Sequence, residues 1–164
     1  MIDWWDIVLR LGVATLASGA IGLNRDLHGK SIGIRTLGLV GLATALIVML
    51  ASPSNVEAGQ LTDATSRVIQ GLLTGIGFLG AGVIVHGDQR KVKGLTSAAC
   101  VWLTACIGIV CGLGHWRLVS IALAFAFVLL VLGGPLERGL HHIFGGKPSD
   151  DAASDKRPER PDGR

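Results

Sequence analysis

Charged residues are scarce in this sequence, and that scarcity is the first guide to its class. Asp, Glu, Lys and Arg make up 16% of the 164 residues, whereas soluble domains average about 25%. Hydrophobic residues make up 49%, and the mean hydropathy is +0.53. The formal net charge is +3, but the basic residues lie beside hydrophobic stretches, where charge orients a membrane protein. We therefore expect a membrane protein and not a partner of nucleic acid.

Cysteines are few, and their spacing suits neither a disulfide nor a metal site. The three cysteines, Cys100, Cys106 and Cys111, lie on one apolar segment. A rigid helix does not bring Cys100 and Cys106 into disulfide geometry, and the spacings of six and five residues match no metal-binding motif. The sequence also has no P-loop and no Ser-His-Asp or Cys-His arrangement. We interpret the cysteines as packing residues and expect no enzyme activity, no metal and no cofactor.

Five long apolar segments provide the strongest structural signal. They cover residues 5–23, 36–51, 68–85, 95–113 and 116–132. About 17–20 helical residues cross a hydrocarbon core of about 30 Å, and the segments lack the period-two alternation of strands. We predict an all-α polytopic membrane protein with five transmembrane helices, forming one membrane domain over residues 1–144. Residues 145–164 are polar and contain three prolines, which predicts a disordered cytoplasmic tail.

The loops between these segments alternate in charge. The loops at 24–35 and 86–94 are basic, whereas the loop at 52–67 carries two acidic residues against one arginine. The positive-inside rule then places the N-terminus outside and the C-terminus in the cytoplasm. The N-terminus carries Asp3 and Asp6 with no base, so it does not resemble a signal peptide. We expect the first segment to remain as a membrane anchor.

Ionisable residues are almost absent from the middles of the predicted spans, which contain no Asp, Glu, Lys or His. Ion passage usually needs such ligands at membrane depth, so the spans favour helix packing over transport. Arg10 is the exception. It lies about 7–9 Å inward from Trp4 and Trp5 at the helical rise. It is therefore either a functional intramembrane charge or a side chain that extends outward to the interface.

Glycines are concentrated in the third apolar segment. They are Gly71, Gly75, Gly77, Gly80 and Gly82. Residues 75–80 spell GxGxxG, but a dinucleotide site needs a βαβ unit, which is missing. The spacing of Gly71 and Gly75 instead predicts a face for close helix packing, with local unwinding at a functional site as the alternative. The same spacing recurs at Gly108 and Gly112.

Polar residues gather in the two basic loops and at the helix starts that follow them. The candidate functional residues are Asn24, Arg25, Asp26, Arg35, Thr36, Lys93 and Thr96, with Gln70 on the third segment. Helix N-termini near basic residues suit an anion, such as a lipid phosphate or an acidic partner segment. The alternative is that these charges only orient the protein in the membrane.

Three parts of the sequence resemble the MgtC/SapB family of bacterial membrane proteins. They are residues 19–26 with 29–36, residues 70–71 with 75–84, and residues 92–99 with Trp102. The resemblance runs in the right order from about residue 10 to residue 114 and implies an inner-membrane protein with five transmembrane helices. The sequence departs from the family at Asn24, where Glu is usual. It also has a short tail in place of the soluble C-terminal domain of longer members.

For function, the resemblance implies adaptation to low magnesium and stress and, in pathogens, survival inside phagocytes. Modulation of the F-type ATP synthase is proposed within the family. We therefore expect a non-enzymatic regulator that contacts lipid and docks on a membrane protein partner, with a homo-oligomer also open. The alternative is a small ion transporter or channel component, suggested by Arg10 and Gln70. A third hypothesis is a lipid-binding scaffold whose basic residues are Arg25, Lys30, Arg90 and Lys93.

Overall fold

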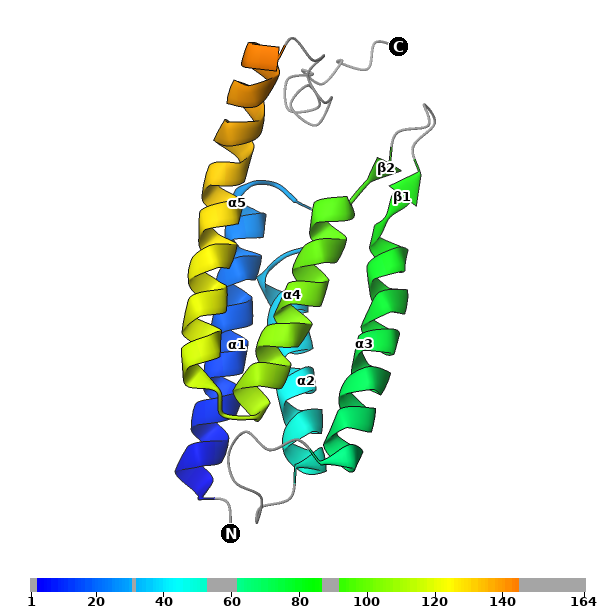
Figure 1. Cartoon of the computed structure of the whole chain (residues 1–164), viewed down its shortest axis with the longest axis vertical. Helices are drawn as coiled ribbons and strands as arrows, with labels where there is room; N and C mark the ends of the chain where they lie inside the picture. The colour runs from blue at the N-terminus through cyan, green and yellow to red at the C-terminus, as the bar shows by residue number, and fades with distance from the viewer. Residues whose placement is uncertain (1–2, 31, 53–61, 87–91, 145–164) are drawn as a thin grey trace, which may run out of the picture. The chain divides into compact units, whose positions relative to one another are not determined.

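The computed structural model describes residues 3–30, 32–52, 62–86 and 92–144. Within them the chain forms five helices and a short pair of strands (Figure 1). The helices are α1 (Trp4–Leu27), α2 (Ile34–Ala51), α3 (Asp63–Val83), α4 (Leu95–Gly112) and α5 (Trp116–Phe144). Strands β1 (Val85–His86) and β2 (Val92–Lys93) pair antiparallel between α3 and α4, with Val85 opposite Lys93. The predicted all-α class with one helix on each apolar segment is confirmed.

Helices α1, α2, α3 and α5 extend beyond the predicted apolar segments at one end or both, whereas α4 matches its segment to within one residue. Helix α1 continues four residues past Leu23 and takes in residues 24–26, which were expected in a loop. Helix α3 begins at Asp63 because the side chain of Thr62 accepts a hydrogen bond from Thr65 N at 3.2 Å, a capping interaction that hydropathy does not detect. Helical structure in these regions therefore depends on polar caps as well as on apolar residues.

Four of the helices, α1 to α4, are long and apolar enough to cross a membrane. The apolar part of α5, Trp116–Leu132, is shorter. At 1.5 Å per residue it covers about 26 Å, at the lower limit of a span. The orientation of the helices across the membrane stays a prediction.

The chain divides into two compact units, residues 1–127 and 128–164, and α5 passes from one into the other. In the second unit the structure describes the end of α5. The predicted tail at 145–164 lies outside the described residues, and the prediction of a single membrane domain over 1–144 stays a prediction.

Helices α1, α2 and α4 pack together in the first unit, and α3 lies against α4 and α2. The core contains Ile21 of α1, Leu37 and Val48 of α2, and Ala105 and Ile107 of α4. Helix α4 is the most buried of the four candidate spans, whereas α3 is the most exposed. One side of α3 is therefore left without a neighbour from the described helices.

Glycines set the distance between the helices of this core. A Cβ atom at Gly41 of α2 would overlap the side chain of Ser18 on α1. A Cβ at Gly108 of α4 would overlap Thr44 and the Gly41 carbonyl, and a Cβ at Gly112 would lie 2.7 Å from the Ala45 carbonyl. Such contacts let backbones approach as in other small-residue helix interfaces. The packing role predicted for the spacing at Gly108 and Gly112 is confirmed.

Candidate functional site

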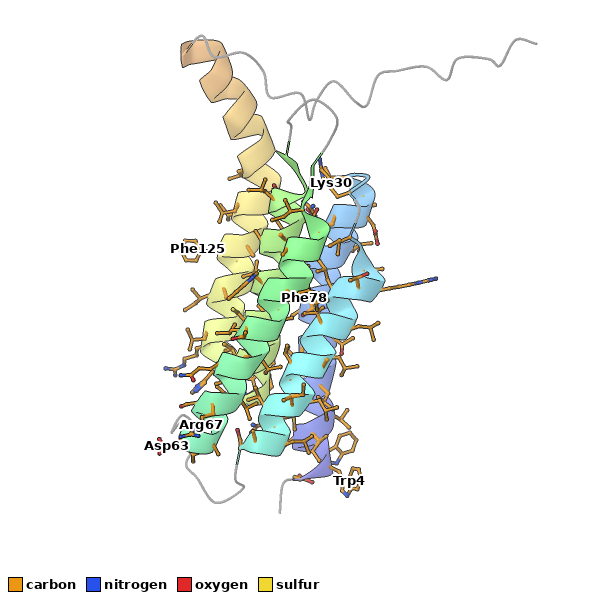
Figure 2. All side chains as sticks on the ribbon, turned by 90° about the vertical axis from the view of Figure 1, so that its right-hand side faces the viewer. Trp4, Lys30, Asp63, Arg67, Phe78 and Phe125 are labelled. Carbon is orange, nitrogen blue, oxygen red and sulfur yellow. The ribbon has the colours of Figure 1, made fainter. Side chains whose placement is uncertain are left out.

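Charged side chains lie at both ends of the first unit. Lys30 lies at one end, and Trp4, Asp63 and Arg67 lie at the other (Figure 2). We call the end near Lys30 the loop end. There α1 and α3 end while α2 and α4 begin. Several of the predicted functional residues come from these helix termini.

Arg25 is buried at the loop end, where it joins α1 to α4. Its side chain is 5% exposed, and Nη2 donates a hydrogen bond to Oγ of Ser97, 72 positions along the chain. Ser97 is also buried and occupies the first turn of α4. Within the described parts of the chain, the buried Nε atom of Arg25 has no hydrogen-bond partner. The predicted functional residue Arg25 is thus a buried cation beside the start of α4.

Asp26, the next residue, serves a different helix. Its Oδ2 atom accepts a hydrogen bond from Ile34 N at 2.9 Å, in the first turn of α2. The residue at the N-cap position, Gly33, has no side chain to do this, and a Cβ there would overlap the Asp26 carboxylate. Asp26 therefore acts as a cap supplied from α1, and its negative charge is favourable at a helix N-terminus.

Replacing this cap should have a measurable cost. Asp26→Ala is expected to lower the free energy of unfolding by about 1 kcal/mol, the usual value of a lost N-cap. Asp26→Asn keeps an acceptor oxygen and should cost less, because only the charge is lost. Thermal unfolding of the detergent-solubilised variants measures both. Equal stability of the wild type and Asp26→Ala would show that Ile34 N finds another hydrogen-bond acceptor.

The remaining predicted polar residues do not all join this cluster. Arg35 and Thr36 are exposed in the first turn of α2, where they line a shallow hollow with Asp26. Thr96 is exposed in the first turn of α4, and Asn24 is half-buried on α1. Lys93 belongs to β2, and its side chain lies outside the described part of the structure.

Gln70 is separate from the loop end. It is exposed on α3, thirteen residues before the helix ends at Val83, or about 20 Å along the axis. Ser97, the partner of Arg25, was not among the functional residues predicted from the sequence. The available signal was chemical: a buried arginine needs an acceptor, and Ser97 offers a hydroxyl in the first turn of a helix.

Arg10 lies at the opposite end. Its Nε atom forms an ion pair with Oδ2 of Asp6 at 2.8 Å, and Nη1 donates to the carbonyl of Gly112 at 2.8 Å. The guanidinium also lies against Gly114, which has φ +78° in the turn after α4. A cation beside the last carbonyl groups of a helix interacts favourably with the negative end of the helix dipole. This geometry supports a structural role in joining α1 to the end of α4.

The glycines of α3 differ from those in the core. A Cβ at Gly71, Gly75, Gly77 or Gly82 would meet nothing within 4 Å, and at Gly80 it would be 3.5 Å from Trp102. Helix α3 continues through all five positions, so the structure has no local unwinding there. Most of these glycines therefore do not pack against the described helices, and packing against another molecule stays a prediction.

Other polar groups within the helices bond to their own backbone. Thr15, Thr44, Thr74 and Thr104 each donate to the carbonyl four residues earlier, at 2.8–2.9 Å. In the described part of the chain, no group of three or more His, Cys, Asp or Glu residues has a metal-binding arrangement. The site features that do stand out are the loop end and the open side of α3.

Comparisons with known proteins agree on one family. The model of the MgtC family matches residues 11–139. Protein SrpB of Synechococcus elongatus is 39% identical over 140 residues, covering 80% of this chain and 76% of SrpB. A protein named putative magnesium transporter YhiD in Escherichia coli is 39% identical over 116 residues, covering 69% of this chain and 54% of YhiD.

Protein MgtC of Salmonella typhimurium is 34% identical over 110 residues, covering 67% of this chain and 45% of that protein. The chain thus spans about half the length of the YhiD and MgtC relatives. No solved structure matches the chain. The matched region contains both the loop end and α3.

Proposed function

The chain belongs to the MgtC family, and on that premise we propose that it is a non-enzymatic membrane regulator. It docks on another protein within the membrane and adjusts that protein's activity during magnesium limitation or related stress. Two relatives carry names that refer to this family or to magnesium, MgtC and putative magnesium transporter YhiD. Those names support the magnesium context, whereas the docking mechanism rests on the structure of α3.

The observation that carries the proposal is an open face on α3. Gly71, Gly75, Phe78 and Gly82 recur every three or four residues, so they share one side of the helix. Nothing lies within 4 Å of a Cβ at the three glycines, and Phe78 is 82% exposed (Figure 2). We call these four residues the glycine face.

The core of the same protein illustrates what such a face can do. Gly41 and Gly108 bring the backbones of α2 and α4 into contact. In lipid there is little hydrophobic drive for helices to associate, so close van der Waals packing over small residues becomes a main source of affinity. The glycine face offers a surface of this type to a helix from outside the chain, and Phe78 adds a large side chain to insert into a partner groove.

The proposed setting is the bacterial inner membrane, with the N-terminus outside and the loop end in the cytoplasm. Trp4 and Asp63 lie at one end, and Lys30 lies at the other (Figure 2). The orientation is supported by the two basic loops, 24–35 and 86–94, which join helices at the loop end, because cytoplasmic loops are enriched in Lys and Arg. The F-type ATP synthase and a second copy of this chain are the partners to test first.

A crosslinking experiment tests the docking proposal. A photoreactive phenylalanine at Phe78 should form adducts with one partner protein in native membranes. The matched probe at Phe125 of α5, also exposed at 67%, should react mainly with lipid. Gly75→Leu should lower the Phe78 adduct by more than tenfold, because four extra heavy atoms would hold the partner helix away.

The control substitution is Gly12→Leu on α1, where a Cβ also meets nothing within 4 Å. It adds the same bulk to another open helix face and should leave the adduct unchanged. Adducts of twice the chain mass would identify a second copy as the partner. Equal adduct yields from the wild type and a folded Gly75→Leu variant would contradict docking through this face.

A small ion transporter or channel component is the second candidate. It is favoured by the printed description of YhiD as a putative magnesium transporter and by exposed Gln70 beside the glycine face. If α3 helices from several copies met, Gln70 would provide polar atoms near membrane depth. Magnesium flux above that of empty vesicles, lost in Gln70→Leu, would favour this candidate over the regulator.

A further inference from the structure

The N-terminus of α4 has no cap from its own chain segment. Its N-cap residue is Gly94, which makes no side-chain hydrogen bond and has φ +92°. A Cβ at this position would overlap the carbonyl of Val83 at the end of α3. Both constraints require glycine, so the usual Ser, Thr or Asp is excluded. The first backbone N–H groups of this 18-residue helix therefore have no side-chain acceptor at the N-cap.

The N-termini of the neighbouring helices α2 and α3 are both capped by side-chain oxygens. Helix α3 uses Oγ1 of Thr62, which accepts from Thr65 N at 3.2 Å. Helix α2, which also begins after a glycine, uses the carboxylate of Asp26 at 2.9 Å from Ile34 N. Helix α4 receives a cation instead, because Arg25 donates to Ser97 in its first turn. An arginine has no acceptor to offer to N–H groups.

Arg25 itself needs a negative partner. Arg25 is only 5% exposed. Its Nε atom has no hydrogen-bond partner among the described residues. Among those residues the one ion pair is that of Arg10 with Asp6, at the opposite end of the unit. Asp26 is adjacent in sequence, but its Oδ2 atom is bonded to α2. The carbonyls at the end of α1 compensate the charge only in part, and a buried unpaired charge is costly.

We propose that Arg25 and the first turn of α4 together bind a phosphate group of an anionic membrane lipid. A phosphate oxygen accepts hydrogen bonds from a guanidinium and from backbone N–H groups at a helix N-terminus. It would cap the N-terminus of α4, as the Asp26 carboxylate caps that of α2. Its negative charge would also lie beside the buried guanidinium of Arg25, which has no ion-pair partner among the described residues.

The position of the site points to lipid as the source of this phosphate. Leu27, Ile34 and Leu95 lie at the same helix termini and are 75%, 45% and 59% exposed, as expected where helices emerge from hydrocarbon. Phosphate groups of lipids lie at that depth. Lys30 and Arg35 are also exposed at the loop end, and they raise the local concentration of anionic headgroups. The proposal does not depend on docking through the glycine face.

Native mass spectrometry of the full chain in detergent tests this site. Dioleoyl phosphatidylglycerol should bind the wild type about tenfold more tightly than dioleoyl phosphatidylcholine. A second arm adds inorganic phosphate at millimolar concentration. No displacement of phosphatidylglycerol supports a lipid ligand, whereas full displacement would overturn the lipid source. Equal binding of the two lipids by the wild type would overturn the site.

Two substitutions locate the binding. Arg25→Gln should weaken phosphatidylglycerol binding about tenfold, the usual loss for one charge-assisted hydrogen bond. Thr96→Glu provides a test that does not remove a buried group, since Thr96 is exposed in the first turn of α4. The new carboxylate is favourable for the helix, but it should repel the lipid phosphate and weaken binding about tenfold.

The matched control is Thr36→Glu, the same exposed substitution in the first turn of α2, where Asp26 already provides the cap. It should change phosphatidylglycerol binding by less than twofold. If Arg25→Gln does not fold, the pair of glutamate variants still decides the question. Equal effects of Thr36→Glu and Thr96→Glu, or no effect of either, would overturn the assignment to α4.

Discussion

Gly108→Leu is expected to destabilise the fold strongly. A Cβ at this position would overlap Thr44 Oγ1 and the carbonyl of Gly41, and the first of these already donates to its own helix. The larger side chain would therefore separate the backbones of α2 and α4, which meet at the buried positions Gly41 and Gly108. The expected loss is about 3 kcal/mol or more, at the upper end for overpacked cores and a large part of ordinary protein stability.

The matched control for this prediction is Gly71→Leu on α3. That position is exposed and a Cβ there meets nothing within 4 Å, and leucine is also a better helix former than glycine. Its stability should equal or slightly exceed that of the wild type. The yield of monodisperse protein in detergent and the Tm distinguish the two variants. A Tm for Gly108→Leu within a few degrees of the wild type would contradict the glycine-mediated packing.

Gly94→Ala is expected to have the second-largest effect, a loss of about 2–4 kcal/mol. Two costs combine at this position. The backbone has φ +92°, which strains any residue with a Cβ by about 1–2 kcal/mol. The Cβ would also overlap the carbonyl of Val83, so α3 or the start of α4 must move. This position links the end of α3 to the beginning of α4.

Gly29→Ala separates these two costs. Gly29 also has positive φ, +62°, but a Cβ there meets nothing within 4 Å. Its substitution should cost only the backbone strain, about 1 kcal/mol. Thermal unfolding of both variants gives the difference due to the contact with Val83. Equal losses for Gly29→Ala and Gly94→Ala would show that the chain relieves this contact without cost.

Much of the fold could be predicted from the sequence because it depends on local properties. A run of apolar residues must form a helix in lipid, whatever its neighbours are, since its backbone groups have no water to bond. The five helical segments follow from such runs, and the basic loops are the polar stretches between them. The helix ends were less predictable, because Thr62 extends α3 and Asp26 caps α2 through single hydrogen bonds.

The candidate site was predicted only as a list of residues. The sequence pointed to Arg25, Asp26 and Thr96, but it did not reveal that the first two bond to different helices. Adjacent residues on a helix point about 100° apart. Which helix each one reaches therefore depends on the rotation and position of every neighbour. Ser97 was missed for the same reason, since only the packing of α4 beside α1 makes its hydroxyl a partner of Arg25.

The sequence alone determined that the protein belongs in a membrane, that it is helical and that its glycines suit close packing, because these are properties of composition and spacing. Only the tertiary structure decided which glycines are used. Gly41 and Gly108 meet across a buried contact, whereas Gly71 and Gly75 face outward. The same GxxxG spacing occurs in both α3 and α4. The physical difference lies in which side of each helix faces its neighbours, and that is decided by the packing of the whole unit.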